Sequence, residues 1–142
     1  MTPPKVGDGW ACDTSIAIAA LDPNHEAHGP CRRAVLERGP ALAGHAVFEA
    51  YAVLTRLPVP LRLSGLQAAD VLTRTFPVGC WLDRKLQSRL LPRLAPLGIL
   101  GGWVYDALVG QAAVANGRTL LTRDRRAERT YRALDVTYSF VA

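Results

Sequence analysis

Four acidic residues stand in sequence surroundings where an acid is unusual. Asp13 and Asp124 each follow directly after a short apolar run that predicts a buried strand. Glu49 and Asp106 are the single acids of two segments whose other residues are almost all apolar, which predicts mostly buried helices. A carboxylate that is removed from water destabilises a protein unless it is paired or bound to a metal ion. These four acids are therefore the candidate functional residues.

The neighbouring residues in the sequence limit which groups could pair with Glu49 and Asp106. No Lys or Arg lies three or four residues from Glu49 or Asp106, so we expect no salt bridge within either helix, while pairing with a distant arginine stays open. Singly, each acid has an ordinary structural explanation. An Asp at a strand end often caps the next helix, and Asp106 near a helix start is favoured by the helix dipole.

Taken together, the four acids predict a cation site. Ligands of open parallel sheets bind beyond the carboxyl ends of the strands, where Asp13 and Asp124 are expected. Four carboxylates that meet in one crevice repel each other, and a divalent cation removes that repulsion. Hard carboxylate oxygens select Mg²⁺ or Mn²⁺, whereas zinc would call for a His and Cys cluster that the sequence lacks.

The charge of the chain favours a phosphate-containing ligand. Of its 17 basic residues fifteen are arginine, and the formal net charge is +5. Guanidinium groups bind phosphate oxygens in a bidentate way, although a general arginine bias in composition would give the same excess. Setting the four acids aside leaves eight acids against 17 bases. An acidic site within a basic surface suits phosphodiester hydrolysis, in which Mg²⁺ polarises a phosphoryl oxygen and activates water.

The elements that must position these acids alternate along the chain. Strands are predicted at residues 10–13, 41–43, 77–81, 119–122 and 136–141. Helices are predicted at 16–21 after an N-cap at Thr14 or Ser15, at 25–38 with a late start or break at Gly29-Pro30, and at 45–57, where His45 caps or packs. Further helices are predicted at 65–76 after Ser64, 83–95 with an interruption at Pro92, 103–116 and 125–134. This alternation predicts an α/β fold with a mostly parallel central sheet flanked by helices.

Length and composition set the limits. A chain of 142 residues with 49% hydrophobic and 20% charged residues fits one compact domain, with residues 1–8 expected to be flexible. No apolar run reaches the roughly 20 residues of a membrane span, and no secretory signal is recognisable, so we expect a cytoplasmic protein. Cys12, Cys31 and Cys80 are expected to be reduced and buried.

In their order and spacing, four short segments resemble the PIN-domain ribonucleases, and within them the VapC-like toxins of toxin–antitoxin systems. The matching segments are Cys12-Asp13-Thr14-Ser15, Phe48-Glu49-Ala50, Gly101-Gly102 ahead of Tyr105-Asp106-Ala107-Leu108, and Leu120-Leu121-Thr122-Arg123-Asp124, and the likeness runs from about Trp10 to Val141.

The resemblance implies a three-layer PIN-like fold and metal-dependent endoribonuclease activity on RNA. The family's acidic quartet maps onto Asp13, Glu49, Asp106 and Asp124. Ser15 and Thr122 map onto supporting hydroxyl positions. The first three acids would hold Mg²⁺ (Mn²⁺ being possible) directly or through water, and Asp124 would complete the site or orient the nucleophilic water.

The resemblance also implies partners. Such toxins form homodimers and are inhibited by a cognate antitoxin that covers the site. Arg126 stands where some members carry a further acid, which argues against a complete second metal site. Arginines beside the site mouth would hold RNA phosphates, namely Arg123, Arg125, Arg126 and Arg129, as could the basic residues of the segment 84–93.

Two other functions compete with the nuclease. One is a PIN-like module that binds RNA or an antitoxin without cutting. The other is an Mg²⁺-dependent phosphoryl-transfer domain of the receiver or phosphatase type, although a phosphatase would need an acid where Ser15 stands and a receiver a lysine beyond Lys85. Trp10, Trp81 and Trp103 form no stacking pattern and are expected to pack in the core or an interface. Residues 63–76 form either core or part of an antitoxin-binding surface.

Overall fold

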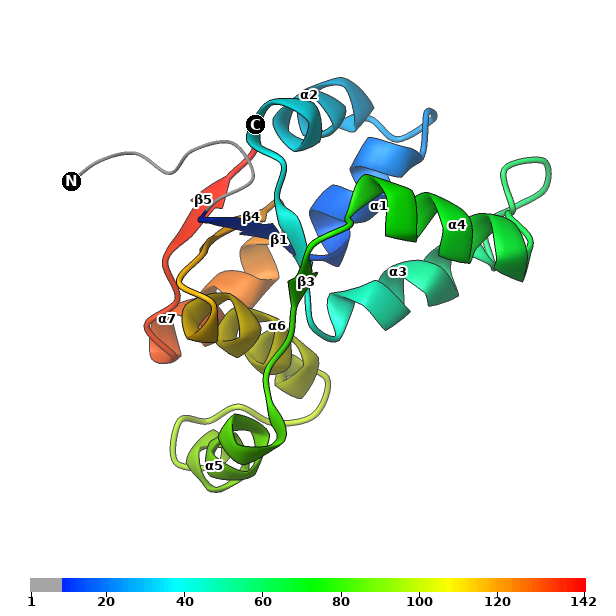
Figure 1. Cartoon of the computed structure of the whole chain (residues 1–142). Coiled ribbons are helices and arrows are strands. Elements are labelled where there is room, and N and C mark those ends of the chain that lie inside the picture. The colour runs from blue at the N-terminus through cyan, green and yellow to red at the C-terminus, as the bar shows by residue number, and fades with distance from the viewer. Residues whose placement is uncertain (1–8) are drawn as a thin grey trace.

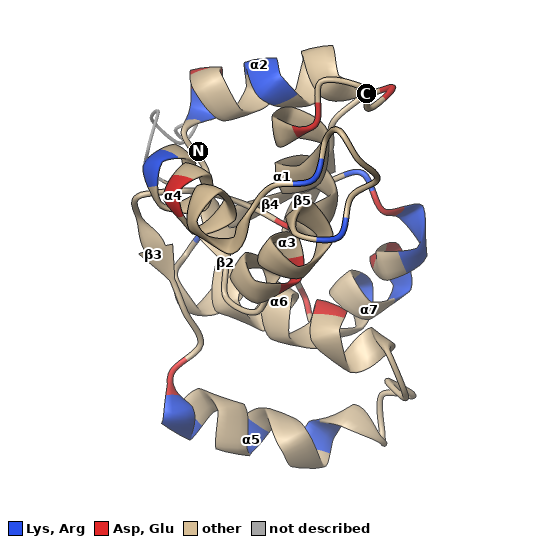
Figure 2. Ribbon diagram, turned by 90° about the vertical axis from the view of Figure 1, so that its right-hand side faces the viewer, with Lys and Arg blue, Asp and Glu red and all other residues tan. Residues whose placement is uncertain are grey.

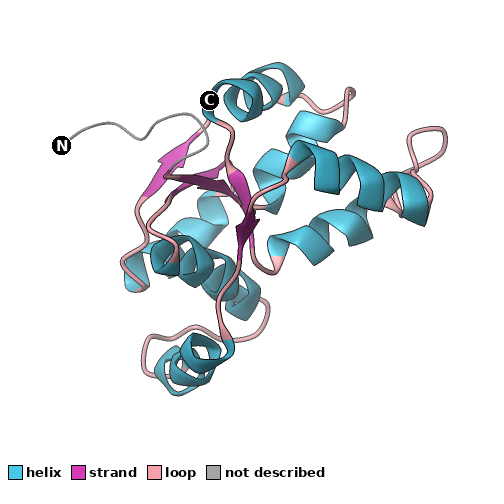
Figure 3. Ribbon diagram, viewed as in Figure 1, coloured by secondary structure: helices cyan, strands magenta, loops and turns pink. Residues whose placement is uncertain are grey.

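A central parallel sheet organises the chain (Figures 1 and 3). The computed structural model describes residues 9–142, and the expectation of a flexible segment at 1–8 lies outside this range. The strand order is β3-β2-β1-β4-β5, and every neighbouring pair is parallel. The strands are β1 (Trp10–Cys12), β2 (Ala41–Ala43), β3 (Gly79–Cys80), β4 (Thr119–Thr122) and β5 (Tyr138–Phe140). The predicted α/β fold is confirmed.

Helices cover both faces of the sheet. Figure 1 shows α1, α3 and α4 on one side of the strands and α6 and α7 on the other, while α5 stands apart at the bottom of the view. The helices are α1 (Thr14–Leu21), α2 (His28–Arg38), α3 (Ala46–Leu54), α4 (Gly65–Thr75), α5 (Arg84–Leu94), α6 (Trp103–Ala115) and α7 (Glu128–Ala133), with a short 3₁₀ helix η1 (Arg125–Ala127) before α7. No helix within residues 9–142 is long and apolar enough to cross a bilayer.

Small residues let the two apolar helices of the site lie close to their neighbours. Helix α3 packs through one narrow stripe, Ala46, Ala50 and Leu54, so Phe48 and Tyr51 are 62% and 40% exposed. The prediction that this helix is mostly buried is therefore wrong for its outer face. In α6, a Cβ on Gly110 would lie 3.1 Å from the Tyr131 ring, so glycine is needed for α7 to pack here.

Three local predictions need correction. The N-cap of α1 is Asp13 and not Thr14 or Ser15, because the Asp13 carboxylate accepts hydrogen bonds from the first free amides. Helix α5 continues through Pro92 to Leu94. The missing amide there removes only one helical hydrogen bond, near the helix end and on an exposed side. The segment 125–134 divides into η1 and α7, since Asp124 caps η1.

Other boundaries follow the sequence signals closely. Ser64 and Gln67 form the reciprocal capping box that starts α4. Asp83 accepts a hydrogen bond from the Leu86 amide at the start of α5. The three cysteines are free and buried, as predicted.

Candidate active site

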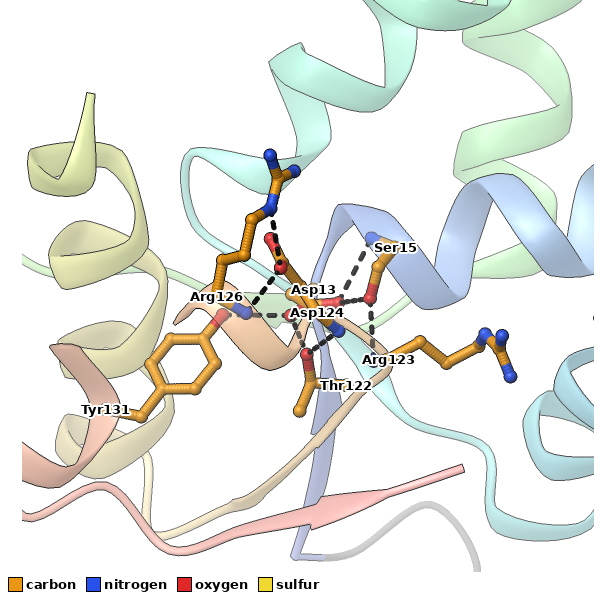
Figure 4. A network of polar contacts seen from close by, with 7 residues as sticks. All are labelled: Asp13, Ser15, Thr122, Arg123, Asp124, Arg126 and Tyr131. Carbon is orange, nitrogen blue, oxygen red and sulfur yellow. Dashed lines mark hydrogen bonds and ion pairs between the residues drawn. The ribbon is translucent and has the colours of Figure 1, made fainter. Parts of the chain in front are cut away.

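Asp13 is the most constrained of the four acids. It ends β1 at the centre of the sheet and is only 5% exposed. Its Oδ1 accepts hydrogen bonds from the Ser15 amide (3.1 Å), the Ile16 amide (3.4 Å) and the Ser15 hydroxyl, while its Oδ2 accepts from the hydroxyls of Thr122 and Tyr131 (Figure 4). The carboxylate is therefore held in one orientation.

Ser15 and Thr122 connect the ends of two strands. Besides binding Asp13, the Ser15 hydroxyl accepts a hydrogen bond from the Arg123 amide (2.9 Å), and the Thr122 hydroxyl accepts one from the Asp124 amide (3.0 Å). The loop that follows β4 is thus attached to the beginning of α1. Both hydroxyls bind the first acid: the resemblance implied this position for Ser15, whereas Thr122 was matched only to the threonine before the last acid.

Tyr131 is the residue that sequence reasoning missed. Its buried hydroxyl donates to Asp13 Oδ2 at 2.9 Å across 118 positions of sequence. Burial and the nearby carboxylates raise the pKa of Tyr131, so it stays a donor at all ordinary pH values. The only signal in the sequence was a single large aromatic residue within a basic helical segment, and that pattern is typical of ordinary packing.

Glu49 lies at the margin of the site. Its side chain is 37% exposed, so it is not the buried acid that its apolar helix predicted. The Thr14 hydroxyl donates to its Oε2 at 3.2 Å, and His45 Nε2 lies 3.8 Å from its Oε1. The expectation of no salt bridge within this helix is therefore wrong when His45 is protonated, because an i, i+4 histidine was not counted as a base. As expected for a packing residue, the His45 ring stacks on Tyr105 of α6, with ring centroids 4.8 Å apart.

Asp106 shows that the four acids act in one electrostatic field. Its pKa is raised from 3.8 to about 7, first by burial and then by Asp124, Asp13 and Glu49, while Arg126 opposes the shift. Among residues 9–142, no group donates a hydrogen bond to Asp106 or forms an ion pair with it. The pKa of Asp13 is also raised by burial, against the lowering effect of its hydrogen bonds.

The donor set fits a hard divalent cation. Its members are carboxylates whose repulsion is visible in the raised pKa of Asp106, and a cation would relieve it. In the part of the chain that the structure describes, however, no three potential ligands stand close enough to hold a metal ion as they are. The partly exposed side chains of Glu49, Asp106 and Asp124 would have to turn inward around the immobile Asp13.

Three of the four candidate phosphate-binding arginines after β4 lie next to the strand end, and they differ in orientation. Arg123 points away from the acids in Figure 4, and its guanidinium donates to the Val141 carbonyl at 3.3 Å. The Arg125 guanidinium lies over the Phe140 ring, 3.7 Å from its centroid. Arg126 turns back toward the site, with its Nε 3.5 Å from Asp124 Oδ1 and its side chain 84% exposed.

Comparison with known proteins identifies relatives over most of the chain. This chain is 44% identical over 126 residues to Ribonuclease VapC27 of Mycobacterium tuberculosis (strain ATCC 25618 / H37Rv). The aligned segment covers 89% of this chain and 92% of the relative. It is 42% identical over 135 residues to Ribonuclease VapC40 of Mycobacterium tuberculosis (strain CDC 1551 / Oshkosh), over 92% of this chain and 98% of the relative. No family model and no solved structure matches the chain. Identity at this level over nearly the full length of both chains means that the protein belongs to the VapC ribonucleases, the PIN-domain toxins of toxin–antitoxin systems.

Proposed function

We propose that this protein is a Mg²⁺- or Mn²⁺-dependent endoribonuclease that hydrolyses RNA phosphodiester bonds beyond the carboxyl ends of β1 and β4. The observation that carries the proposal is the identity of 42–44% to two ribonucleases over most of the chain, and the raised pKa of Asp106, to which burial and then each of the other three acids contribute, supports it. Residues from two strand ends and two helices, separated by up to 111 positions, thus share one field. Because the proposed substrate is RNA, we place the activity in the cytoplasm.

The surroundings of each acid indicate its role in binding the proposed cation. Asp13 is the fixed ligand, because five hydrogen bonds hold its carboxylate. Glu49 and Asp106, which are partly exposed, are the ligands that adjust to the cation, and Asp124 completes the site or orients the attacking water. A bound Mg²⁺ or Mn²⁺ supplies Lewis-acid polarisation of a phosphoryl oxygen and activates water for attack. Ser15 and Thr122 keep Asp13 and the loop after β4 in register.

The arginines around this site are the proposed phosphate contacts. Arg126 is placed best, because it is exposed and already lies beside Asp124. Arg123 and Arg125 lie farther along the same loop and would contact phosphates away from the reacting one. Figure 2 shows basic residues along η1–α7 and along α5. The rival hypothesis of a binding module that does not cut RNA has no support from the acids, since all four are present.

Cleavage by the purified full chain tests the proposal. Total RNA is incubated with the protein in Mg²⁺, in Mn²⁺ and in EDTA, together with the variants Asp13→Asn and Asp106→Asn. Asp70→Asn, an exposed acid of α4 paired with Arg74, is the matched control. We expect cleavage only with a cation, its loss in both site variants and its retention in the control. Undiminished cleavage by Asp13→Asn and Asp106→Asn would contradict the metal site.

A cognate antitoxin and a second copy of the chain are the proposed partners. A cleft of about 470 Å³ lies between α3, α4 and the edge strand β3, and exposed apolar side chains such as Phe48 and Trp81 line it. Exposed apolar patches of this kind mark protein interfaces. Helix α4 has Leu72 in the core and Leu66 88% exposed, so its outer side is accessible to such a partner.

These partners are tested separately from the chemistry. Expression of the protein should arrest growth, and co-expression of the small open reading frame beside its gene should restore it. Light scattering on the purified chain should give the mass of two copies. A monomer at micromolar concentration would contradict the homodimer, and growth arrest that no neighbouring gene relieves would contradict the antitoxin.

A further inference from the structure

A second cleft, which we call the α7 cleft, lies beside the acids and has no assigned function. It measures about 620 Å³ and is formed by residues 97–102, the beginning of α6, and the segment η1–α7. One wall is basic, with Arg126 and Arg129, and the other is apolar, with Leu97, Leu100 and Trp103. Among residues 9–142, no acidic residue lines it.

The basic wall contains a cation without an ion-pair partner. Arg129 is exposed, and no carboxylate within residues 9–142 lies within ion-pair distance of it. Its guanidinium lies over the backbone of Gly98, since a Cβ built on that glycine would be 3.6 Å from Arg129 Nη2. Arg126 and Arg129 are three positions apart, so their side chains share one side of the η1–α7 segment. An anionic ligand in the α7 cleft would meet both guanidinium groups.

The apolar wall presents an accessible aromatic ring. Trp103 is 44% exposed and is flanked in the cleft by Leu97 and Leu100, which are 37% and 65% exposed. Of the two alternatives predicted for Trp103, core or interface, the structure excludes the core. A planar base placed against an indole ring gains stacking energy whatever its identity, because every base has a π face.

The α7 cleft borders the acidic site through Arg126. Arg126 lines the cleft and also lies beside Asp124, and its charge lowers the pKa of Asp106. Trp103 precedes Asp106 by three positions on α6, which places the two near one another on the helix surface. A polymer with a phosphate at the acids would therefore pass directly into the cleft.

We propose that the α7 cleft is a nucleotide subsite of the RNA substrate. It binds the nucleotide next to the scissile phosphate, with a backbone phosphate on Arg129 and the base on Trp103. The inference rests on the proposed ribonuclease function. RNA suits the cleft better than an acidic peptide, because a charged wall opposite an aromatic wall matches the phosphate and base of one nucleotide, and the cleft opens onto the cutting site.

The salt dependence of RNA binding separates the two walls. Variants are made in the Asp106→Asn background so that RNA is bound and not cut, and the probe is a fluorescent pool of short single-stranded RNA of random sequence. Arg129→Gln should weaken binding and reduce the slope of log K against log salt by about 0.7, as expected for one lost phosphate contact. Trp103→Ala should weaken binding about ten-fold at an unchanged slope, and Trp103→Phe should restore most of the loss.

The matched control is Arg132→Gln. It removes the same charge from the same helix, but the Arg132 guanidinium is bonded to Glu128 and Tyr138 and does not line the cleft. Circular dichroism and thermal melting of each variant establish that it is folded. We expect this control to bind RNA like the Asp106→Asn parent, with the same slope.

Three results would overturn the subsite. The first is Arg129→Gln and Trp103→Ala binding RNA like the control while the wild-type chain still cuts RNA, which leaves the ribonuclease function intact. The second is unchanged RNA binding with weakened inhibition by the antitoxin, which would assign the cleft to a protein. The third is a wild-type chain that neither binds nor cuts RNA, which would remove the proposed function and the subsite together.

Discussion

The strand side and the helix side of the acidic site are built on opposite principles. At the strand side, Asp13 is buried and accepts five hydrogen bonds from amides and hydroxyls. At the helix side, Asp106 receives none from the described residues, and its pKa rises to about 7 because of burial and the other acids. The fold therefore holds the Asp13 carboxylate in place, whereas the Asp106 carboxylate has no ion-pair partner among the described residues.

This difference means that one part of the site fixes the position of a carboxylate, while the other part holds carboxylates whose charges are not balanced. A network that includes hydroxyls from β4 and α7 determines where one ligand oxygen lies before any cation arrives. Repulsion among the remaining acids opposes their convergence, and the proposed cation would supply the missing stabilisation. Such a division is the expected design for a site that binds a hydrated ion and then a polyanion, because fixed ligands give geometry and adjustable ligands accommodate both states.

Loss of the fixed ligand should have the largest effect. Asp13→Asn replaces an acceptor oxygen by an amide that cannot accept from Thr122 and Tyr131 and removes a negative charge from the site. We expect RNA cleavage to fall by more than about 100-fold, beyond the range for residues that only orient a ligand. Initial rates in Mg²⁺ measure it, with Asp135→Asn as an exposed control. A fall of only a few-fold would show that Asp13 is no anchor.

Loss of a positioning hydroxyl should cost less. Tyr131→Phe keeps the ring that packs against α6 and removes one of the two donors to Asp13 Oδ2. We expect about a ten-fold weaker Mg²⁺ affinity, with most of the maximal rate retained at high Mg²⁺. A Mg²⁺ titration of the cleavage rate measures it. An equal loss at every Mg²⁺ concentration would contradict a positioning role.

The raised pKa of Asp106, on the helix side, should make the stability of the protein depend on pH. Folded Asp106 titrates near pH 7 and unfolded aspartate near 3.8, so between these values the native state binds more protons. The stability associated with Asp106 is thus complete below about pH 4 and is lost as the pH rises to about 7. In metal-free buffer, we expect the Tm of the wild-type chain to fall below that of Asp106→Asn by roughly 5 °C over this range.

Melting curves from pH 4 to pH 8, with and without Mg²⁺, test this expectation. Mg²⁺ should raise the Tm of the wild-type chain more at pH 8 than at pH 5, because protonated Asp106 is a poor ligand. Parallel curves for the wild-type chain and Asp106→Asn would mean that no charge repulsion is concentrated at this residue.

The smallest effect on cleavage is expected for a substitution at Arg125. The Arg125 guanidinium already lies over the Phe140 ring, so Arg125→Gln removes a weakly engaged phosphate contact. We expect cleavage within about two-fold of the wild-type rate at low salt, and a larger loss for Arg126→Gln, whose guanidinium borders Asp124. Rates at two salt concentrations compare them, and the reverse order would mean that RNA leaves the site along Phe140.

Much of the architecture could be predicted because it depends on local patterns. Short apolar runs indicated all five strands, and Ser64 and Asp83 marked helix starts within one residue. The misjudged boundaries have local causes of another kind. At Pro92 the cost of a missing amide was overestimated, and at Asp13 one side chain serves both as a helix cap and as the central acid of the site.

The sequence by itself determined the fold class and the family resemblance and singled out the four acids as candidates, because hydrophobic periodicity and a lone charge in an apolar segment are visible along the chain. Only the tertiary structure decided how those acids differ. Tyr131 reaches Asp13 across 118 positions, and the His45 ring stacks on Tyr105 only because α3 and α6 lie side by side. Hydrogen bonds and electrostatic fields depend on distance in space, and the chain fixes that distance only after its helices have packed against the sheet.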